Sequence, residues 1–305
     1  YSTSFGGAFY VWMLILLVFV IQAVAYEFRR KPNNFLGEKS YNAFLVINGI
    51  AGTFLLGAAV GTLFTGANFT VDRMNLGNIS GVNTISQWTT PWRGLEALTD
   101  YRNWALGLAV LFLSRILGLQ YFLNNIDDET IAMRSRKHLV YNAGPFLICF
   151  LTFLISLLGA NGWAVDPATG VISIEPLKYL HNLLDMPVIM VLLLLGIVAV
   201  LWGMGTAIFK GSRHSIWFSG IGTVVTVLSL LLLAGYNNTA YYPSLADMQS
   251  SLTIYNSSSS LFTLKAMSIV SLLIPFVVAY IWYAWRAMNR KPISRQEIKS
   301  EEHLY

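Results

Sequence analysis

The sequence predicts an all-α, polytopic integral membrane protein with seven transmembrane helices. Of its 305 residues, 55% are hydrophobic and 11% are charged, whereas soluble domains carry about 25% charged residues. The mean hydropathy is +0.56. The apolar residues gather in seven long runs, each close to the ~20 residues that a helix needs to cross a bilayer core. Basic residues also concentrate on one side of the predicted membrane, as in most polytopic proteins.

The seven predicted spans have no acidic residue in their interior. In chain order they cover residues 8–26, 42–65, 103–124, 139–158, 186–209, 216–235 and 261–285. The last span is followed at once by Arg286, Arg290 and Lys291, and positive charge at the end of a span marks the cytoplasmic side. A turn signal, residues 166–170 (DPATG), lies in the loop after the fourth span.

Small and polar residues in the second span point to helix packing. Gly57 and Gly61 form a small-xxx-small pair, which allows another helix to approach closely. Asn48 is a lone amide within the same span, and we expect it to form a hydrogen bond to a neighbouring helix.

The distribution of basic residues sets the predicted orientation as N-terminus outside and C-terminus inside. With this orientation, fourteen Lys and Arg residues lie in inner segments and four in outer ones. The links between spans indicate one transmembrane domain over residues 1–305, with a cytoplasmic C-terminal tail at 286–305. The net charge of +5 is spread over these short segments, so no nucleic-acid partner is predicted.

Two cations fall inside predicted spans. Arg115 lies about 18 Å deep at 1.5 Å per residue. It either meets an acid, a haem propionate or a carbonyl of another subunit, or it reaches the inner interface and local carbonyls by itself. Lys265 lies about one turn below the outer interface, where its long side chain can extend to the headgroups. We treat both as candidates for intramembrane or partner contacts, together with Asn48, Gly57 and Gly61.

The residues that carry most enzyme chemistry are missing from the predicted spans. His138, His181, His214 and His303 all lie outside the middle of a span, whereas a transmembrane haem takes a His or Met ligand from a helix. No acid lies near a span centre, where proton-coupled carriers place one. The single cysteine, Cys149, excludes an internal disulfide. We therefore expect this chain to contribute no catalytic, cofactor-binding or metal-ligating residue.

Several stretches in order along the chain resemble subunit II of the bacterial cytochrome bd-type quinol oxidases. They are residues 1–10 (YSTSFGGAFY), 26–29 (YEFR), 57–72 (GAAVGTLFTGANFTVD), 251–256 (SLTIYN) and 291–305 (KPISRQEIKSEEHLY). The family fold has nine helices, arranged as two four-helix bundles plus one. This sequence supplies seven of them, so the resemblance implies that it lacks the first two transmembrane helices of the family, which would come before Tyr1.

The resemblance also implies a role. Subunit II would be a haemless, accessory subunit in the inner membrane that supports a haem-bearing subunit I during quinol oxidation and oxygen reduction in the respiratory chain. The complex would be a heterodimer with b- and d-type haems in subunit I. Small single-span subunits, membrane lipids and a structural quinone would be further partners. This chain would belong to an oxidoreductase without carrying chemistry itself.

Two other classes fit part of the pattern. A seven-helix retinal or ligand receptor would also have seven spans and a lysine in the last one, but Lys265 is too close to the span end and no acid is available as counter-ion. A small-molecule carrier would need a polar site at mid-membrane or broken helices. Visible absorbance with added retinal that disappears on Lys265→Ala would favour the receptor.

Overall fold

Seven helices in the described part of the chain are long and apolar enough to cross a membrane. The computed structural model describes residues 2–31, 34–72, 74, 85–288 and 293–294. Each predicted span coincides with one of these helices. The all-α, polytopic fold class predicted from the sequence is therefore confirmed.

The spans are formed by the following elements: α2 (Phe9–Phe28); α3 (Glu38–Ile47), the π-helical η1 (Asn48–Gly52) and α4 (Thr53–Thr65); α5 (Tyr101–Asn125); α6 (Glu129–Leu158); α8 (Pro187–Gly205) with the π-helical η4 (Thr206–Lys210); α9 (Ser215–Gly235); and α11 (Leu261–Ser271) with α12 (Ile274–Met288). Shorter helices are α1 (Ser2–Gly6), η3 (Leu95–Thr99), α7 (Lys178–Asp185), η5 (Met248–Ser250) and α10 (Ile254–Ser257).

The fourth span begins ten residues earlier than the sequence predicts. We expected it to start at Leu139, but α6 starts at Glu129. The side chain of Asp128 accepts a hydrogen bond from the backbone N–H of Ile131 and caps the helix. Arg and Lys are good helix formers, so the basic residues after this cap continue the helix beyond the apolar segment.

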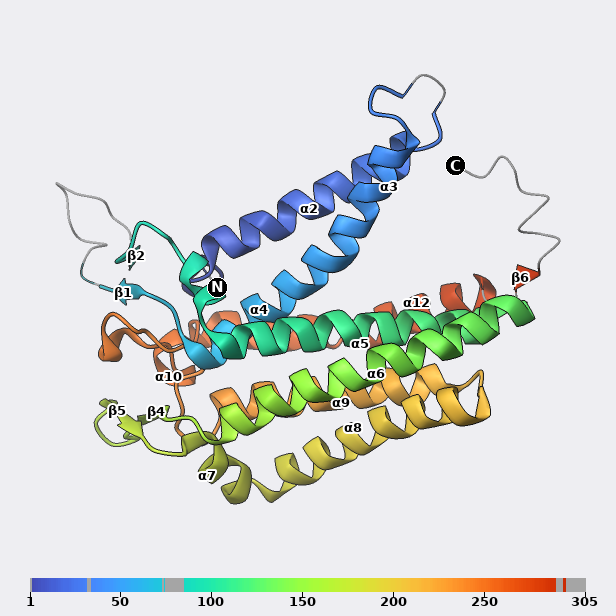
Figure 1. The fold of residues 1–305 in the computed structure, drawn as a ribbon. Helices are drawn as coiled ribbons and strands as arrows, with labels where there is room; N and C mark the ends of the chain where they lie inside the picture. Colours follow the sequence, from blue (N-terminus) through green and yellow to red (C-terminus); the bar gives the residue numbers. More distant parts are fainter. Residues whose placement is uncertain (1, 32–33, 73, 75–84, 289–292, 295–305) are drawn as a thin grey trace.

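The helices α5, α6, α8 and α9 form a four-helix bundle, with α4 packed along α5 (Figure 1). Two clusters of buried side chains fill it. The outer cluster includes Phe64, Phe153 and Leu233, and the inner one includes Ile116 and Leu139. Because both clusters draw on α5, α6 and α8, these helices are held along most of their length.

The hairpin of α2 and α3 leans away from this bundle (Figure 1). Its base is held by a small apolar cluster in which Ala8, Val11, Leu55 and Ala97 are buried. Most other large side chains of α2 are exposed. The hairpin therefore presents an apolar surface that the described residues leave uncovered.

The loops at the predicted outer side contain short strands. β1 (Phe69–Val71) pairs with β2 (Ser86–Trp88), and β4 (Gly162–Val165) pairs with β5 (Ile172–Glu175), both antiparallel. The predicted turn joins β4 to β5: Asp166 accepts hydrogen bonds from the backbone N–H of Ala168 and the hydroxyl of Thr169. The segment that the sequence suggested as a plain loop is thus a hairpin followed by α7.

The last span is not buried against the other spans in the described part of the chain. In its most apolar 18-residue window, 0% of the residues are buried. Its helix continues to Met288, so the tail predicted at 286–305 begins with helical residues, and most of the remainder lies outside the described residues. Two tail residues form β6 (Ile293–Ser294), which pairs with β3 (Ile126–Asp127) in the link between α5 and α6.

Candidate functional site

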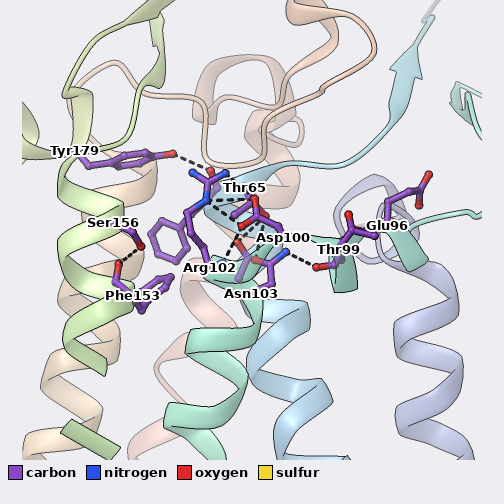
Figure 2. A network of polar contacts seen from close by, with 12 residues as sticks. Thr65, Glu96, Thr99, Asp100, Arg102, Asn103, Phe153, Ser156 and Tyr179 are labelled. Atoms are coloured by element: carbon purple, nitrogen blue, oxygen red, sulfur yellow. Dashed lines mark hydrogen bonds and ion pairs between the residues drawn. The ribbon is translucent and has the colours of Figure 1, made fainter. Parts of the chain in front are cut away.

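An ion pair lies where α5 begins. Asp100 precedes the first residue of α5 and accepts a hydrogen bond from the backbone N–H of Arg102 at 2.8 Å, as a helix-capping residue does. The guanidinium of Arg102 returns to the same carboxylate, with Nη2 donating to Oδ2 at 2.7 Å (Figure 2). Burial by itself raises the pKa of Asp100, but the hydrogen bonds and charge of Arg102 outweigh it and hold that pKa below its usual range.

Asn103 extends this cluster into the protein. Its side chain is 0% exposed, donates to the backbone oxygen of Ala97 at 2.7 Å and accepts from the hydroxyl of Thr65 at 3.1 Å. Thr65 is the last residue of α4, and Ala97 belongs to η3, so one amide joins three elements (Figure 2). A buried amide with these partners fixes the end of α4 against the start of α5.

Glu96 closes the other side of the cluster. Its carboxylate accepts from the hydroxyl of Thr90, from the backbone N–H of Gly94 at 2.8 Å and from the amide of Asn68. Burial alone would raise the pKa of Glu96, but these hydrogen bonds together lower it. Glu96, Asp100 and Asn103 line a cavity of about 180 Å³ between the first outer loop and Leu245. The lining of the cavity is part polar and part apolar, and because their pKa values are lowered, its two carboxylates are ionised at neutral pH.

A second cluster of charges lies on α7 and β5. The Glu175 carboxylate accepts from Lys178 Nζ at 3.0 Å and contacts His181 Nδ1 at 2.8 Å. The hydrogen bond with His181, followed by that of Lys178, lowers the pKa of Glu175 despite partial burial. Because the Lys178 side chain is largely buried beside Gly162, this cluster fixes α7 against the β4–β5 hairpin.

The glycine pair predicted to allow a close helix approach does face another helix. A Cβ on Gly57 would fall 2.7 Å from the Cα of Gly107, and a Cβ on Gly61 would fall 2.3 Å from Asn103 Oδ1. The partner is α5, so the contact is internal to this chain. The two glycines therefore set the α4–α5 distance on which the Asn103 hydrogen bonds depend.

Asn48 forms a hydrogen bond between helices. Its Nδ2 donates to the side-chain oxygen of Gln22 on α2. Asn48 is the first residue of η1, and Gly52 at the end of η1 lies against the Asn48 side chain. Asn48 Oδ1 is buried and has no partner among the described residues. This amide thus joins the two helices of the hairpin and retains one unused acceptor.

The two intramembrane cations lie apart from these clusters. The Arg115 side chain is exposed on α5, and Lys265 is exposed on the second turn of α11. No hydrogen bond or ion pair joins either one to another residue in the part of the chain that the structure describes. The structure therefore does not bring the five candidate residues together: Gly57 and Gly61 share one interface, and Asn48, Arg115 and Lys265 occupy three separate places.

The described histidines do not fit an axial haem ligand at mid-membrane. His138, His181 and His214 are all exposed, and each lies outside the buried core of the bundle. Met204 is buried in that core, but it packs among apolar side chains. Within the described residues, no three His, Cys, Asp or Glu side chains are close enough to hold a metal ion.

The chain is similar to known proteins over nearly its whole length. A family model described as cytochrome bd terminal oxidase subunit II matches residues 1–288. The chain belongs to that family. It is 24% identical over 317 residues to the cytochrome bd-I ubiquinol oxidase subunit 2 of Escherichia coli (strain K12), covering 99% of this chain and 79% of that one. It is 25% identical over 307 residues to the cytochrome bd ubiquinol oxidase subunit 2 of Bacillus subtilis (strain 168), covering 97% and 77%.

Membership of the cytochrome bd subunit II family confirms the resemblance seen in the sequence. This chain is a subunit of a cytochrome bd-type quinol oxidase, which is an oxidoreductase complex, and it is a multi-pass protein of the bacterial inner membrane. The polar cluster around Asp100 is a feature that the sequence reasoning missed. The signal was present: an aspartate directly before an apolar run marks a helix start.

Proposed function

We propose that this chain is the haemless, non-catalytic subunit of its oxidase, packed against a haem-bearing subunit I as a heterodimer. In this role it stabilises the partner while subunit I oxidises quinol and reduces oxygen. The family match supports a subunit of such a complex, and the relatives are named as second subunits of ubiquinol oxidases. The division of labour between the subunits is our proposal.

The last span is the observation that carries this proposal. It is an apolar helix, Leu261–Met288, with 0% of the residues buried in its apolar 18-residue window, while the other spans bury 22–39% of the corresponding windows. Helices associate in membranes through close side-chain packing, and this helix lacks such packing within the described chain. A partner subunit with its own apolar helices would supply it.

Arg115 supports the same arrangement. A guanidinium within a span is costly in hydrocarbon and normally faces protein or water. Arg115 has no described partner in this chain and is exposed on α5. We propose that it contacts an acidic group or carbonyls of subunit I. The alternative is that it extends to the inner interface by itself.

The haems are assigned to subunit I because the described residues of this chain do not fit them. The histidines lie outside the core, and the buried Met204 is enclosed by apolar neighbours. We therefore propose that the b- and d-type haems of the complex have their ligands in the partner. A structural quinone, small single-span subunits and bound lipids remain predictions of the family resemblance.

Purification of the complex tests this function directly. With an affinity tag at the C-terminus, the protein is extracted from its native membrane in mild detergent. A reduced-minus-oxidised spectrum and mass identification of co-eluting chains are then recorded. We expect b- and d-type bands together with a polytopic partner. Arg115→Leu should lower the yield of the partner several-fold, whereas Arg115→Lys should retain most of it because the charge remains.

Two results would overturn the proposal. One is a haem spectrum in this chain when it is isolated free of any partner. The other is a haem-bearing partner that assembles with an unchanged spectrum in cells that lack this chain. Neither the family match nor the relatives give support to a receptor or a carrier, and binding of retinal at Lys265 is not expected.

A further inference from the structure

A groove runs along the face of α8 that points away from the bundle. It has a volume of about 390 Å³ and is lined by Val198, Leu201, Trp202, Gly205, Thr206, Phe209 and Lys210. These residues recur every three or four positions, so they form a single stripe of one helix. A Cβ on Gly205 would meet no atom within 4 Å, so this glycine leaves a notch between the exposed rings of Trp202 and Phe209.

The groove has the length of one membrane leaflet. From Val198 to Lys210 the helix rises about 18 Å at 1.5 Å per residue. The hydrocarbon core of a bilayer is about 30 Å thick, so one leaflet contributes about 15 Å. Lys210 is the last residue of η4, at the side to which the excess of basic residues assigns the cytoplasm. The groove therefore extends from the inner headgroups toward the membrane centre.

Lys210 lines the groove at its headgroup end, and a second cation, Arg136, lies against the next residue, Gly211. A Cβ built on Gly211 would lie 1.6 Å from Arg136 Nη2, so the guanidinium of Arg136, which belongs to α6, rests on the residue next to Lys210. Gly211 has a φ of 60°, which glycine adopts at no steric cost. Its missing side chain leaves room for the Arg136 guanidinium beside Gly211, one residue beyond the lining of the groove.

The surrounding charges leave this end of the groove positive. Arg213 is paired with Asp127, so that pair contributes no net charge. The remaining described charges nearby on α6 are the acids Asp128 and Glu129 at its start and the bases Arg134 and Lys137 beside Arg136. Neither Arg136 nor Lys210 has a described ion-pair partner. An anion at this place would be attracted by both.

We propose that this groove binds an anionic phospholipid of the cytoplasmic leaflet. One acyl chain lies in the notch at Gly205 between Trp202 and Phe209, and the phosphate lies between Lys210 and Arg136. A lipid fits better than a helix of another protein because the groove is apolar along its length and basic only at its headgroup end. The proposal rests on the membrane placement of α8 and is independent of the role proposed for the subunit.

Native mass spectrometry of the purified complex tests the lipid site. The complex is partly delipidated and titrated with phosphatidylglycerol or, at the same chain length, zwitterionic phosphatidylcholine. We expect one phosphatidylglycerol to bind in clear preference to phosphatidylcholine. Removal of one cation by Lys210→Gln or Arg136→Gln should weaken phosphatidylglycerol binding about fivefold, and removal of both about thirtyfold, since each cation near an anionic surface contributes about the same amount.

Matched control variants test whether the loss of lipid binding is specific to this groove or is a general effect of charge and side-chain size. Lys39→Gln removes the same charge from an exposed position on α3, at the same predicted side of the membrane, and should leave binding unchanged. Gly205→Leu fills the notch and should weaken both lipids. Gly220→Leu, at a glycine whose Cβ would also meet no atom within 4 Å, should not. The same spectra report whether the complex is intact, so loss of lipid is distinguished from loss of assembly.

Several outcomes would overturn the proposal. These are equal affinity for the two lipids, unchanged binding in the Lys210→Gln/Arg136→Gln variant, or an equal loss in Lys39→Gln. A small protein that is bound to the complex and is released by Gly205→Leu, with no change in lipid binding, would identify the groove as a protein contact instead.

Discussion

Asp100 and Arg102 form a closed ion pair at the outer end of α5, with Arg102 Nη2 2.7 Å and Nε 3.1 Å from the carboxylate oxygens of Asp100. The backbone N–H of Arg102 donates to the same carboxylate. One aspartate therefore caps the helix and fixes the arginine. Because both side chains are about three-quarters buried, the pair is shielded from the salt screening that weakens surface pairs.

Asp100→Asn should destabilise the protein by about 2 kcal/mol, since charge-assisted hydrogen bonds are lost and the Arg102 guanidinium remains partly buried without its counter-charge. Arg102→Met should cost about as much, and the double variant less than the sum, because the two side chains act on each other. Thermal unfolding of the detergent-solubilised protein, followed by circular dichroism, measures these changes. Additive effects of the two single variants would contradict the coupling.

Protonation of three carboxylates on the outer face should destabilise the protein at low pH. The pKa values of Asp100, Glu96 and Glu175 are all lowered in the folded protein. Carboxylates of this kind contribute stability at a pH above their unfolded pKa, about 4, and this stability is lost as the pH falls through the lower folded pKa. The melting temperature should therefore not change on account of these groups between pH 7 and about pH 5, and it should fall below pH 4. Glu96→Gln should reduce the size of that fall, whereas an equal fall in this variant would contradict the assignment.

Replacement of the small residues between α4 and α5 should separate the two helices. Gly57→Ala places a Cβ against the Gly107 backbone, and Gly61→Ala places one against the Asn103 side chain. We expect a loss of about 1–3 kcal/mol for each, as for other overpacked interiors. Gly49→Ala is the matched control in the same span, because a Cβ there meets no atom within 4 Å. Equal losses in all three variants would show that helix propensity or the membrane, and not this contact, is responsible.

Asn103→Leu should be more damaging than an ordinary substitution in a span. It leaves the buried Ala97 carbonyl without the Asn103 donor and removes one of the two acceptors of the Thr65 hydroxyl, the other being the Gly61 carbonyl. The cost of unsatisfied buried groups suggests a loss of about 2–3 kcal/mol. Limited proteolysis of the first outer loop measures the effect locally, because η3 should be released from α5. Asn124→Leu, at the other end of α5, serves as the control and should leave this loop protected.

The hydrogen bond between Asn48 and Gln22 should contribute less to the stability of the protein than its position within the membrane suggests. Polar pairs between membrane helices contribute about 0.6 kcal/mol on average. Asn48→Leu should therefore lower stability by an amount of this order, and the Asn48→Leu/Gln22→Leu variant should recover much of it, because both polar groups are then removed. A loss of several kcal/mol in the single variant would indicate that Asn48 Oδ1 has a partner outside the described residues.

The helix contact at Gly57 and Gly61 shows what a local sequence pattern can and cannot predict. Their spacing indicated a tight helix contact, and the contact exists. The spacing could not say which helix fills it, because any apolar helix satisfies the same pattern. The fold assigns it to α5, within the chain. For the same reason, the exposed position of Arg115 on α5 became evident only once the packing of the bundle was known.

The seven spans and the family could be predicted from the sequence alone. These depend on the length and hydropathy of single segments and on the order of short motifs, which are local properties of the chain. The cluster of Asp100, Arg102 and Asn103, the α7 contacts and the groove on α8 are visible only in the folded protein. Each of these joins residues from elements distant in sequence or depends on which face of a helix the bundle leaves uncovered. A contact such as that of Thr65 with Asn103, 38 residues apart, is set by the combined packing of all the helices, and no single segment encodes it.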